Sequence, residues 1–138
     1  MKMIGHKYLL DSNIIIEIFK GNNLFAEKLS KEEILYMPCI VLGELYTGVN
    51  RVLNKTKHLK ILTDFLQLCT VDNIDSTTAN YYGDTMAALH KKGKSIPTND
   101  VWIASIALEN NFTLITNDKH FKDVPNLKMI HWQKDLNL

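Results

Sequence analysis

Four carboxylates in this chain of 138 residues interrupt segments that are otherwise largely apolar. Asp11 lies in "YLLDSNIIIEIF", Glu44 in "IVLGELYTG", Asp100 in "NDVWIASIA" and Asp118 in "LITNDKHF". Carboxylates that lie close together repel one another and raise one another's pKa, unless a cation lies among them. If the fold brings these four side chains together, we expect them to bind a metal ion.

The donor atoms limit which ion this would be and what it would do. An all-oxygen set favours Mg²⁺, with Mn²⁺ as a substitute, over Zn²⁺. The sequence contains no G-x-x-x-x-G-K or G-x-G-x-x-G nucleotide loop. A carboxylate-held ion without such a loop points to hydrolysis at phosphorus, because the ion can activate water and neutralise charge that develops on the phosphate.

Polar residues next to the carboxylates are candidates for supporting roles. Asn13 follows the first aspartate by two residues, and Thr116 and Asn117 directly precede the last. We expect their hydrogen bonds to position the carboxylates and the attacking water. His120, two residues after the last aspartate, could also reach the site, although we expect it to face solvent in a loop.

Each carboxylate also has an explanation that needs no metal. Asp11 could cap the helix that follows it, Asp100 could interact with a helix dipole, and Asp118 could form an Asx turn. Glu44 could lie on the surface or pair with Arg51, seven residues further on. A shared site is favoured by the four residues together and not by any one of them.

The elements that must position these residues form an alternating pattern. Short apolar runs alternate with helical patterns, which predicts one α/β domain over residues 1–138, with a mostly parallel sheet of four to five strands flanked by helices. In such sheets, ligand sites form outside the carboxyl ends of the strands. The predicted strands span residues 7–10, 34–38, 69–74, 112–116 and 127–130, and the predicted helices span 12–20, 24–30, 39–53, 55–68, 76–93 and 99–111.

Composition narrows the class of protein further. The net charge of +1 is not that of a strongly basic nucleic-acid-binding domain. No apolar run reaches the roughly 18 residues of a membrane span. Cys39 and Cys69 fit no metal or redox spacing, and we expect them to be buried thiols in a reducing compartment. These features predict a cytoplasmic protein without a membrane partner.

The four acidic segments, taken in order, resemble a known family. "LLDSN", "VLGELYTG", "NDVWIASIA" and "LITNDKHF" resemble the PIN-domain ribonucleases and, within them, the VapC toxins of VapBC toxin–antitoxin pairs. The resemblance extends from Tyr8 to about Trp132. It implies a PIN-like fold with Asn13 and Thr116 as supporting polar residues and an acidic metal site formed by Asp11, Glu44, Asp100 and Asp118.

The resemblance also implies an activity and partners. Family members cleave RNA with Mg²⁺ or Mn²⁺, commonly act as dimers and are held inactive by a cognate antitoxin. We therefore expect a homodimeric endoribonuclease that inhibits growth or translation. Attack by water, and not by the ribose 2′-hydroxyl, would leave a 5′-phosphate and a 3′-hydroxyl. Lys91, Lys92 and Lys94, which precede Asp100, are expected to hold the RNA backbone.

Three other functions are open on the sequence alone. A PIN nuclease that processes RNA without a toxin role would have the same site but no antitoxin gene beside its own. A haloacid-type phosphatase needs a second aspartate two residues after the first, where this chain has Asn13. A Mg²⁺-binding receiver module needs a phospho-accepting aspartate after its third strand and a lysine after its last, and Asp72 and Lys128 are poor candidates for these.

Overall fold

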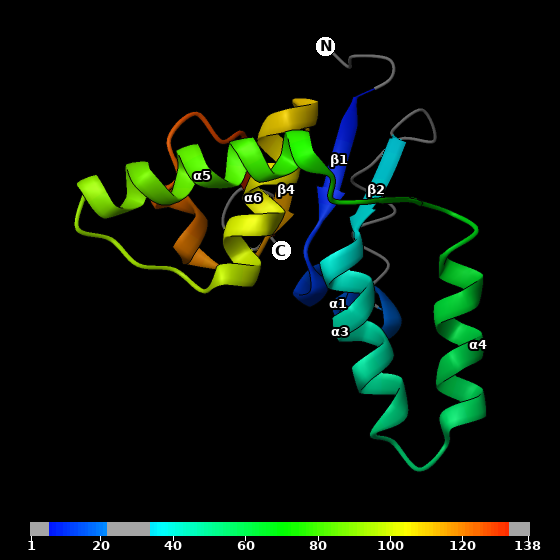
Figure 1. Ribbon diagram of the computed structural model, residues 1–138. Helices are drawn as coiled ribbons and strands as arrows, with labels where there is room; N and C mark the ends of the chain where they lie inside the picture. The colour runs from blue at the N-terminus through cyan, green and yellow to red at the C-terminus, as the bar shows by residue number, and fades with distance from the viewer. Residues whose placement is uncertain (1–5, 22–33, 133–138) are drawn as a thin grey trace.

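A five-stranded parallel sheet forms the centre of the protein, as predicted. A computed structural model describes residues 6–21 and 34–132. The strands follow the order β3-β2-β1-β4-β5, and every neighbouring pair is parallel (Figure 1). Their bounds are β1 Lys7–Leu10, β2 Ile34–Pro38, β3 Thr70–Asp72, β4 Thr113–Thr116 and β5 Met129–His131.

Helices connect these strands and pack around them. Helix α5 packs against α6, and α3 packs against both α1 and α4. Figure 1 shows the α3–α4 pair extending beyond the carboxyl ends of β1 and β2. The described helices are α1 Ser12–Phe19, α3 Cys39–Asn50, α4 Lys55–Phe65, α5 Ser76–Lys91, α6 Thr98–Asn110 and the 3₁₀ helix η1 Lys119–Asp123.

The central strands and α6 form the core. All four residues of β4 are buried, as are Tyr8 to Leu10 of β1. Strands that are covered on both faces are apolar throughout, which is typical of parallel sheets. Helix α6 buries every residue from Ile103 to Ala107, because this part of its sequence is largely apolar on all sides. The acidic residues at the ends of these elements are therefore attached to the most deeply buried part of the fold.

Several predicted boundaries differ from the structure. The expected helix at residues 24–30 lies outside the described residues. Helix α3 ends at Asn50 and not at residue 53, because Val52 and Leu53 are exposed and have no core to pack against. Strand β5 begins at Met129, where it pairs with Leu114, and not at residue 127. Helix η1 was not predicted.

Two smaller expectations concern the cysteines and the membrane. Cys39 and Cys69 are free thiols, but they are only partly buried. Burial raises the pKa of the Cys69 thiol to about 11. Among the helices of residues 6–21 and 34–132, none combines the length and the hydropathy needed to cross a membrane.

Candidate active site

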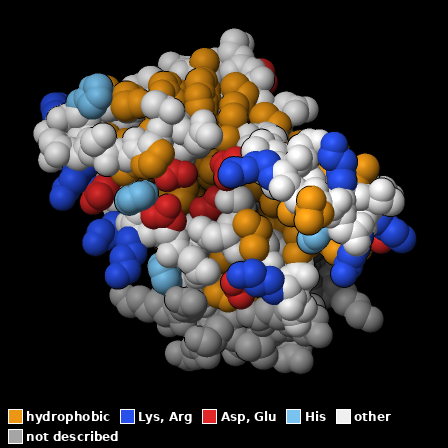
Figure 2. Space-filling model, turned by 90° about the horizontal axis from the view of Figure 1, so that it is seen from below, with side chains coloured by type: hydrophobic (Ala, Val, Ile, Leu, Met, Phe, Trp, Pro, Cys, Tyr) orange, Lys and Arg blue, Asp and Glu red, His pale blue; other side chains and the backbone are white. Residues whose placement is uncertain are grey.

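The loops that follow β1 and β4 meet at the carboxyl edge of the sheet. Leu10 of β1 pairs with Ile115 of β4, and the backbone N–H of Asp11 donates to the Ile115 carbonyl at 3.1 Å. Asp11 and Thr116 therefore leave the sheet side by side. Figure 2 looks onto this edge and shows acidic side chains gathered near its centre, with histidine beside them and lysine or arginine around them.

Asp11 is a buried carboxylate, with 4% of its surface exposed. One carboxylate oxygen accepts the Ser12 backbone N–H at 2.8 Å, so Asp11 also caps α1. The other accepts the Thr116 hydroxyl at 2.7 Å and the Asn13 side-chain amide at 3.4 Å. Burial raises the pKa of Asp11, the charge of Asp118 raises it further, and these hydrogen bonds lower it. The capping role and a role in a shared site are thus compatible.

Thr116 and Asn13 join the two loops. The Thr116 hydroxyl, besides donating to Asp11, accepts the backbone N–H of Asp118 at 2.9 Å. The side-chain oxygen of Asn13 accepts the backbone N–H of Asn117 at 3.1 Å. Asn117 contributes through its backbone, whereas its side-chain oxygen is buried and has no hydrogen-bond partner among the described residues. The positions of both aspartates consequently depend on these polar contacts.

We expect Thr116→Val to weaken the binding of divalent ions by about 10- to 100-fold, as is typical when a residue that positions a metal ligand is removed. Valine has a similar shape but leaves the buried Asp11 oxygen without the threonine hydroxyl. Thr116→Ser, which keeps the hydroxyl, is the matched control and should bind like the unmodified protein. Calorimetric titration with Mn²⁺ measures both, and equal affinities for valine and serine would contradict this role.

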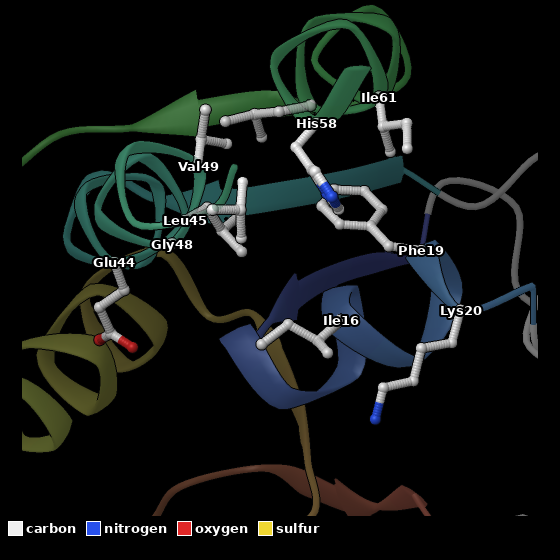
Figure 3. Close-up of a pocket in the computed structure, with 11 residues that line it drawn as sticks. Ile16, Phe19, Lys20, Glu44, Leu45, Gly48, Val49, His58 and Ile61 are labelled. Carbon is white, nitrogen blue, oxygen red and sulfur yellow. The ribbon is translucent and has the colours of Figure 1, made fainter. Parts of the chain in front are cut away.

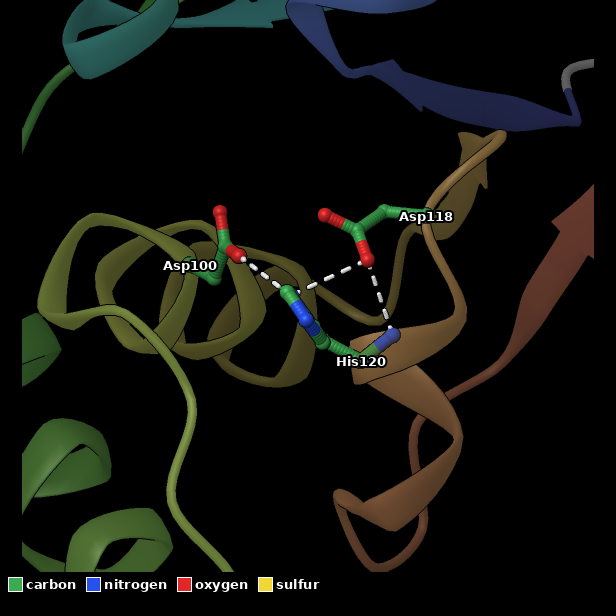
Figure 4. A group of neighbouring side chains, drawn as sticks. All are labelled: Asp100, Asp118 and His120. Atoms are coloured by element: carbon green, nitrogen blue, oxygen red, sulfur yellow. Dashed lines mark hydrogen bonds and ion pairs between the residues drawn. The ribbon is translucent and has the colours of Figure 1, made fainter.

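Asp100, Asp118 and His120 form a compact group (Figure 4). One potential ligand atom from each lies within 4.8 Å of the other two. The His120 Nδ1 atom is 3.0 Å from an Asp118 carboxylate oxygen and 3.5 Å from one of Asp100. Asp100 reaches this position from the first turn of α6.

His120 was expected to face solvent in a loop, but it lies in the short helix η1 and its ring reaches the carboxylates. Asp118 caps η1 by accepting the backbone N–H of His120 at 2.9 Å, and this short helix turns the imidazole toward the carboxylates. About half of the His120 side chain is still exposed. The two-residue spacing of an Asp cap and the residue that donates to it was the signal that the sequence offered.

The three aspartates influence one another electrostatically. Partial burial and the negative charges of Asp11 and Asp118 raise the pKa of Asp100 to about 6, although His120 opposes this rise. A divalent cation would relieve the repulsion. The available donors are carboxylate oxygens and one imidazole nitrogen, a set that fits a hard or intermediate divalent ion.

The structure places Glu44 apart from this group. Glu44 is exposed on α3 and lines a cleft of about 320 Å³ between α1, α3 and α4 (Figure 3). Among the described residues it forms no ion pair with Arg51, and it does not belong to the group formed by Asp100, Asp118 and His120. Helix α3 does contact α6, the helix that carries Asp100. The sequence predicted a helix around Glu44 but could not predict where this side chain lies relative to the aspartates.

The three lysines that were expected to bind RNA are exposed near the end of α5. Lys91 is the last residue of that helix, and Lys94 lies in the loop that leads to α6. The Lys92 ammonium group donates to the backbone carbonyl of Asp123 in η1 at 2.9 Å. Lys92 therefore attaches the end of α5 to the same short helix that carries His120.

Known proteins resemble this sequence over nearly its full length. A family model described as PIN domain matches residues 8–127. Ribonuclease VapC2 of Rickettsia felis is 36% identical, with the match covering 92% of this chain and 98% of the relative. Ribonuclease VapC2 of Haemophilus influenzae is 30% identical, with coverage of 91% and 98%.

Solved structures agree with these relatives. A chain in the crystal structure of VapBC2 from Rickettsia felis bound to a DNA fragment from their promoter has a TM-score of 0.83 and 34% identity, covering 90% of this chain and 97% of that one. A chain of VapBC-1 from nontypeable Haemophilus influenzae has a TM-score of 0.84 and 31% identity, with coverage of 93% and 99%. The chain therefore belongs to the PIN-domain family and is of the VapC type.

Proposed function

We propose that this protein is a metal-dependent endoribonuclease and the toxin of a toxin–antitoxin pair. The observation that carries the proposal is the convergence of Asp11, Asp100 and Asp118 at the carboxyl edge of the sheet, where mutual repulsion and burial raise the pKa of Asp100. The relatives from Rickettsia felis and Haemophilus influenzae carry the name ribonuclease, which supports the same activity.

Each residue of the site has a proposed task. Asp100 and Asp118 hold a divalent ion, Mg²⁺ or Mn²⁺, and Asp11 contributes a third carboxylate. Thr116 and Asn13 keep Asp11 and the loop after β4 in place through their hydrogen bonds. When bound, the ion supplies a positive charge at the phosphate and lowers the pKa of a water molecule.

Glu44 is proposed to supply a fourth carboxylate from the neighbouring helix. Its side chain is exposed and forms no ion pair that would hold it in place in the described part of the chain. Because α3 contacts α6, a rearrangement of this flexible side chain could bring its charge toward the ion without moving the core.

The proposal is tested by incubating the purified protein with total cellular RNA and Mg²⁺ or Mn²⁺. New RNA ends that carry 5′-phosphates, absent with EDTA and with Asp11→Asn, are the expected result. Glu17→Asn, which changes a carboxylate elsewhere on α1, is the control and should cleave normally. Cleavage that persists with EDTA or with Asp11→Asn would contradict a metal-dependent mechanism.

The exposed lysines near the end of α5 are proposed to bind the RNA backbone. We expect Lys91→Ala combined with Lys94→Ala to weaken RNA binding and to reduce the slope of log affinity against log salt by about 0.7 for each phosphate that is no longer neutralised. Lys92→Ala should in addition destabilise the protein, because it removes the bond to Asp123. Filter binding at several salt concentrations measures the slope, and an unchanged slope would exclude these lysines from the interface.

An antitoxin is the proposed protein partner, since the similar solved structures are of VapBC pairs. The cleft between α1, α3 and α4 is its proposed binding surface, because apolar residues line it and Ile16 and Val52 there are exposed. A small gene beside this one, whose product binds the protein and blocks cleavage, would separate a toxin from a PIN nuclease that only processes RNA.

The protein is also proposed to form a homodimer. Light scattering of the purified protein should then give twice the mass of one chain.

A further inference from the structure

The His120 ring reaches the acidic site through a defined local structure. Asp118 caps η1 through the backbone N–H of His120, which fixes the start of the His120 side chain beside the Asp118 carboxylate. The Nδ1 atom then lies 3.0 Å from Asp118 and 3.5 Å from Asp100 (Figure 4). Nδ1 is thus the ring atom that faces the space between the two carboxylates.

These spacings match what a single ion requires of its ligands. Ligand atoms on neighbouring corners of an octahedron, each at about 2.1 Å from the ion, lie about 3 Å apart. The separations from Nδ1 to the two carboxylate oxygens are 3.0 and 3.5 Å, and one potential ligand atom from each of the three residues lies within 4.8 Å of the other two. One ion could therefore contact all three with only small side-chain adjustments.

We propose that His120 is a metal ligand through Nδ1, together with Asp100 and Asp118, and that it makes the site prefer Mn²⁺ to Mg²⁺. This inference rests on the proposed metal-dependent function. An imidazole nitrogen is a favourable ligand for a transition metal, whereas Mg²⁺ prefers oxygen ligands and keeps several waters. A site of oxygens alone would have no such ligand to favour Mn²⁺.

If His120 instead acts as a counter-ion, its removal should have the opposite effect on metal affinity. A protonated imidazole at the same distances would act as a counter-ion to the two carboxylates and would compete with the metal. Its removal would then leave the affinity for Mn²⁺ unchanged or increase it. The direction of the change in metal affinity therefore separates a ligand from a counter-ion.

The test is calorimetric titration of the full chain with Mn²⁺ and with Mg²⁺, without RNA. His120→Ala should lower the affinity for Mn²⁺ by about tenfold or more and change that for Mg²⁺ much less. His120→Gln, which offers an oxygen, should keep Mg²⁺ binding but not restore the preference for Mn²⁺. His58→Ala, at an exposed position on α4, is the control and should behave as the unmodified protein. Circular dichroism confirms that each variant is folded.

Pulsed electron paramagnetic resonance gives a second readout that is independent of affinity. Bound Mn²⁺ should show coupling to a histidine nitrogen in the unmodified protein and in His58→Ala, but not in His120→Ala. Binding and nitrogen coupling that are unaffected by His120→Ala would overturn this inference and leave the proposed function standing. An unmodified protein that binds neither ion would instead overturn the metal dependence of the proposed function.

Discussion

Asp100→Asn is expected to lower RNA cleavage by about 10³-fold while making the metal-free protein more stable at neutral pH. The loss of activity follows because a carboxylate that holds the ion is worth several kcal/mol in the transition state. The gain in stability follows because the negative charge of Asp100 lies close to those of Asp11 and Asp118. A purely structural residue would show the reverse pattern, with activity lost because the fold is lost.

The gain in stability of Asp100→Asn should grow as pH rises. In the folded protein the pKa of Asp100 is about 6, above the ordinary value of 3.8 that applies when the chain is unfolded. The folded state therefore binds more protons than the unfolded state between about pH 4 and pH 6, and the stability contributed by this group falls as pH rises through that range. Asp100→Asn removes this fall.

Denaturant unfolding with a chelator present measures the effect. At pH 7.5 we expect Asp100→Asn to raise the free energy of unfolding by about 1 kcal/mol, a value reduced for the partial exposure of the side chain. At pH 4 the difference should be close to zero. Asp84→Asn, at an exposed position on α5, is the matched control and should show no such pH-dependent gain. A destabilised Asp100→Asn protein at pH 7.5 would mean that the interaction of Asp100 with the α6 dipole is the larger effect.

Divalent ions are expected to stabilise the folded protein as well as to activate it. At a free ion concentration of 100 times the dissociation constant, the free energy of unfolding should rise by about 2.7 kcal/mol, because the ion binds the folded site and not the unfolded chain. The rise should be smaller at pH 5, where Asp100 is largely protonated and cannot act as a ligand. EDTA should reverse the stabilisation and abolish cleavage together.

Thermal unfolding with and without Mn²⁺ checks this second prediction. The double variant Asp100→Asn with Asp118→Asn should show almost no stabilisation, since it lacks two of the three clustered groups that are proposed to hold the ion. The same stabilisation in the double variant as in the unmodified protein would show that the ion binds elsewhere on the molecule.

The fold was predictable from the sequence where local patterns decide the structure. The bounds of β1 and β2 agree with the prediction, because Asp11 and Ser12 directly follow the first apolar run and Pro38 ends the second. Helix α6 is apolar around most of its circumference, so its burial was clear. Strand β5 lies at the edge of the sheet, and only its pairing with β4 decides which residues it contains.

The site was predictable only in part, because some of its positions depend on capping and tertiary packing. Asp11 and Asp118 both follow parallel strands, so the rule for the carboxyl edge brings them together. His120 reaches the site because Asp118 caps a 3₁₀ helix, which hydrophobic periodicity does not reveal. The position of Glu44 depends on how α3 packs against α1 and α6, and this follows from tertiary contacts and not from the helical pattern alone.

The most direct test of the account is a crystal structure of the protein soaked in Mn²⁺, with anomalous scattering recorded to locate the metal. We predict a peak within about 2.4 Å of carboxylate oxygens of Asp100 and Asp118, on the side that faces Asp11. A well-ordered site without a peak at saturating Mn²⁺, or a peak only at other residues, would contradict the claim that these aspartates form a metal centre.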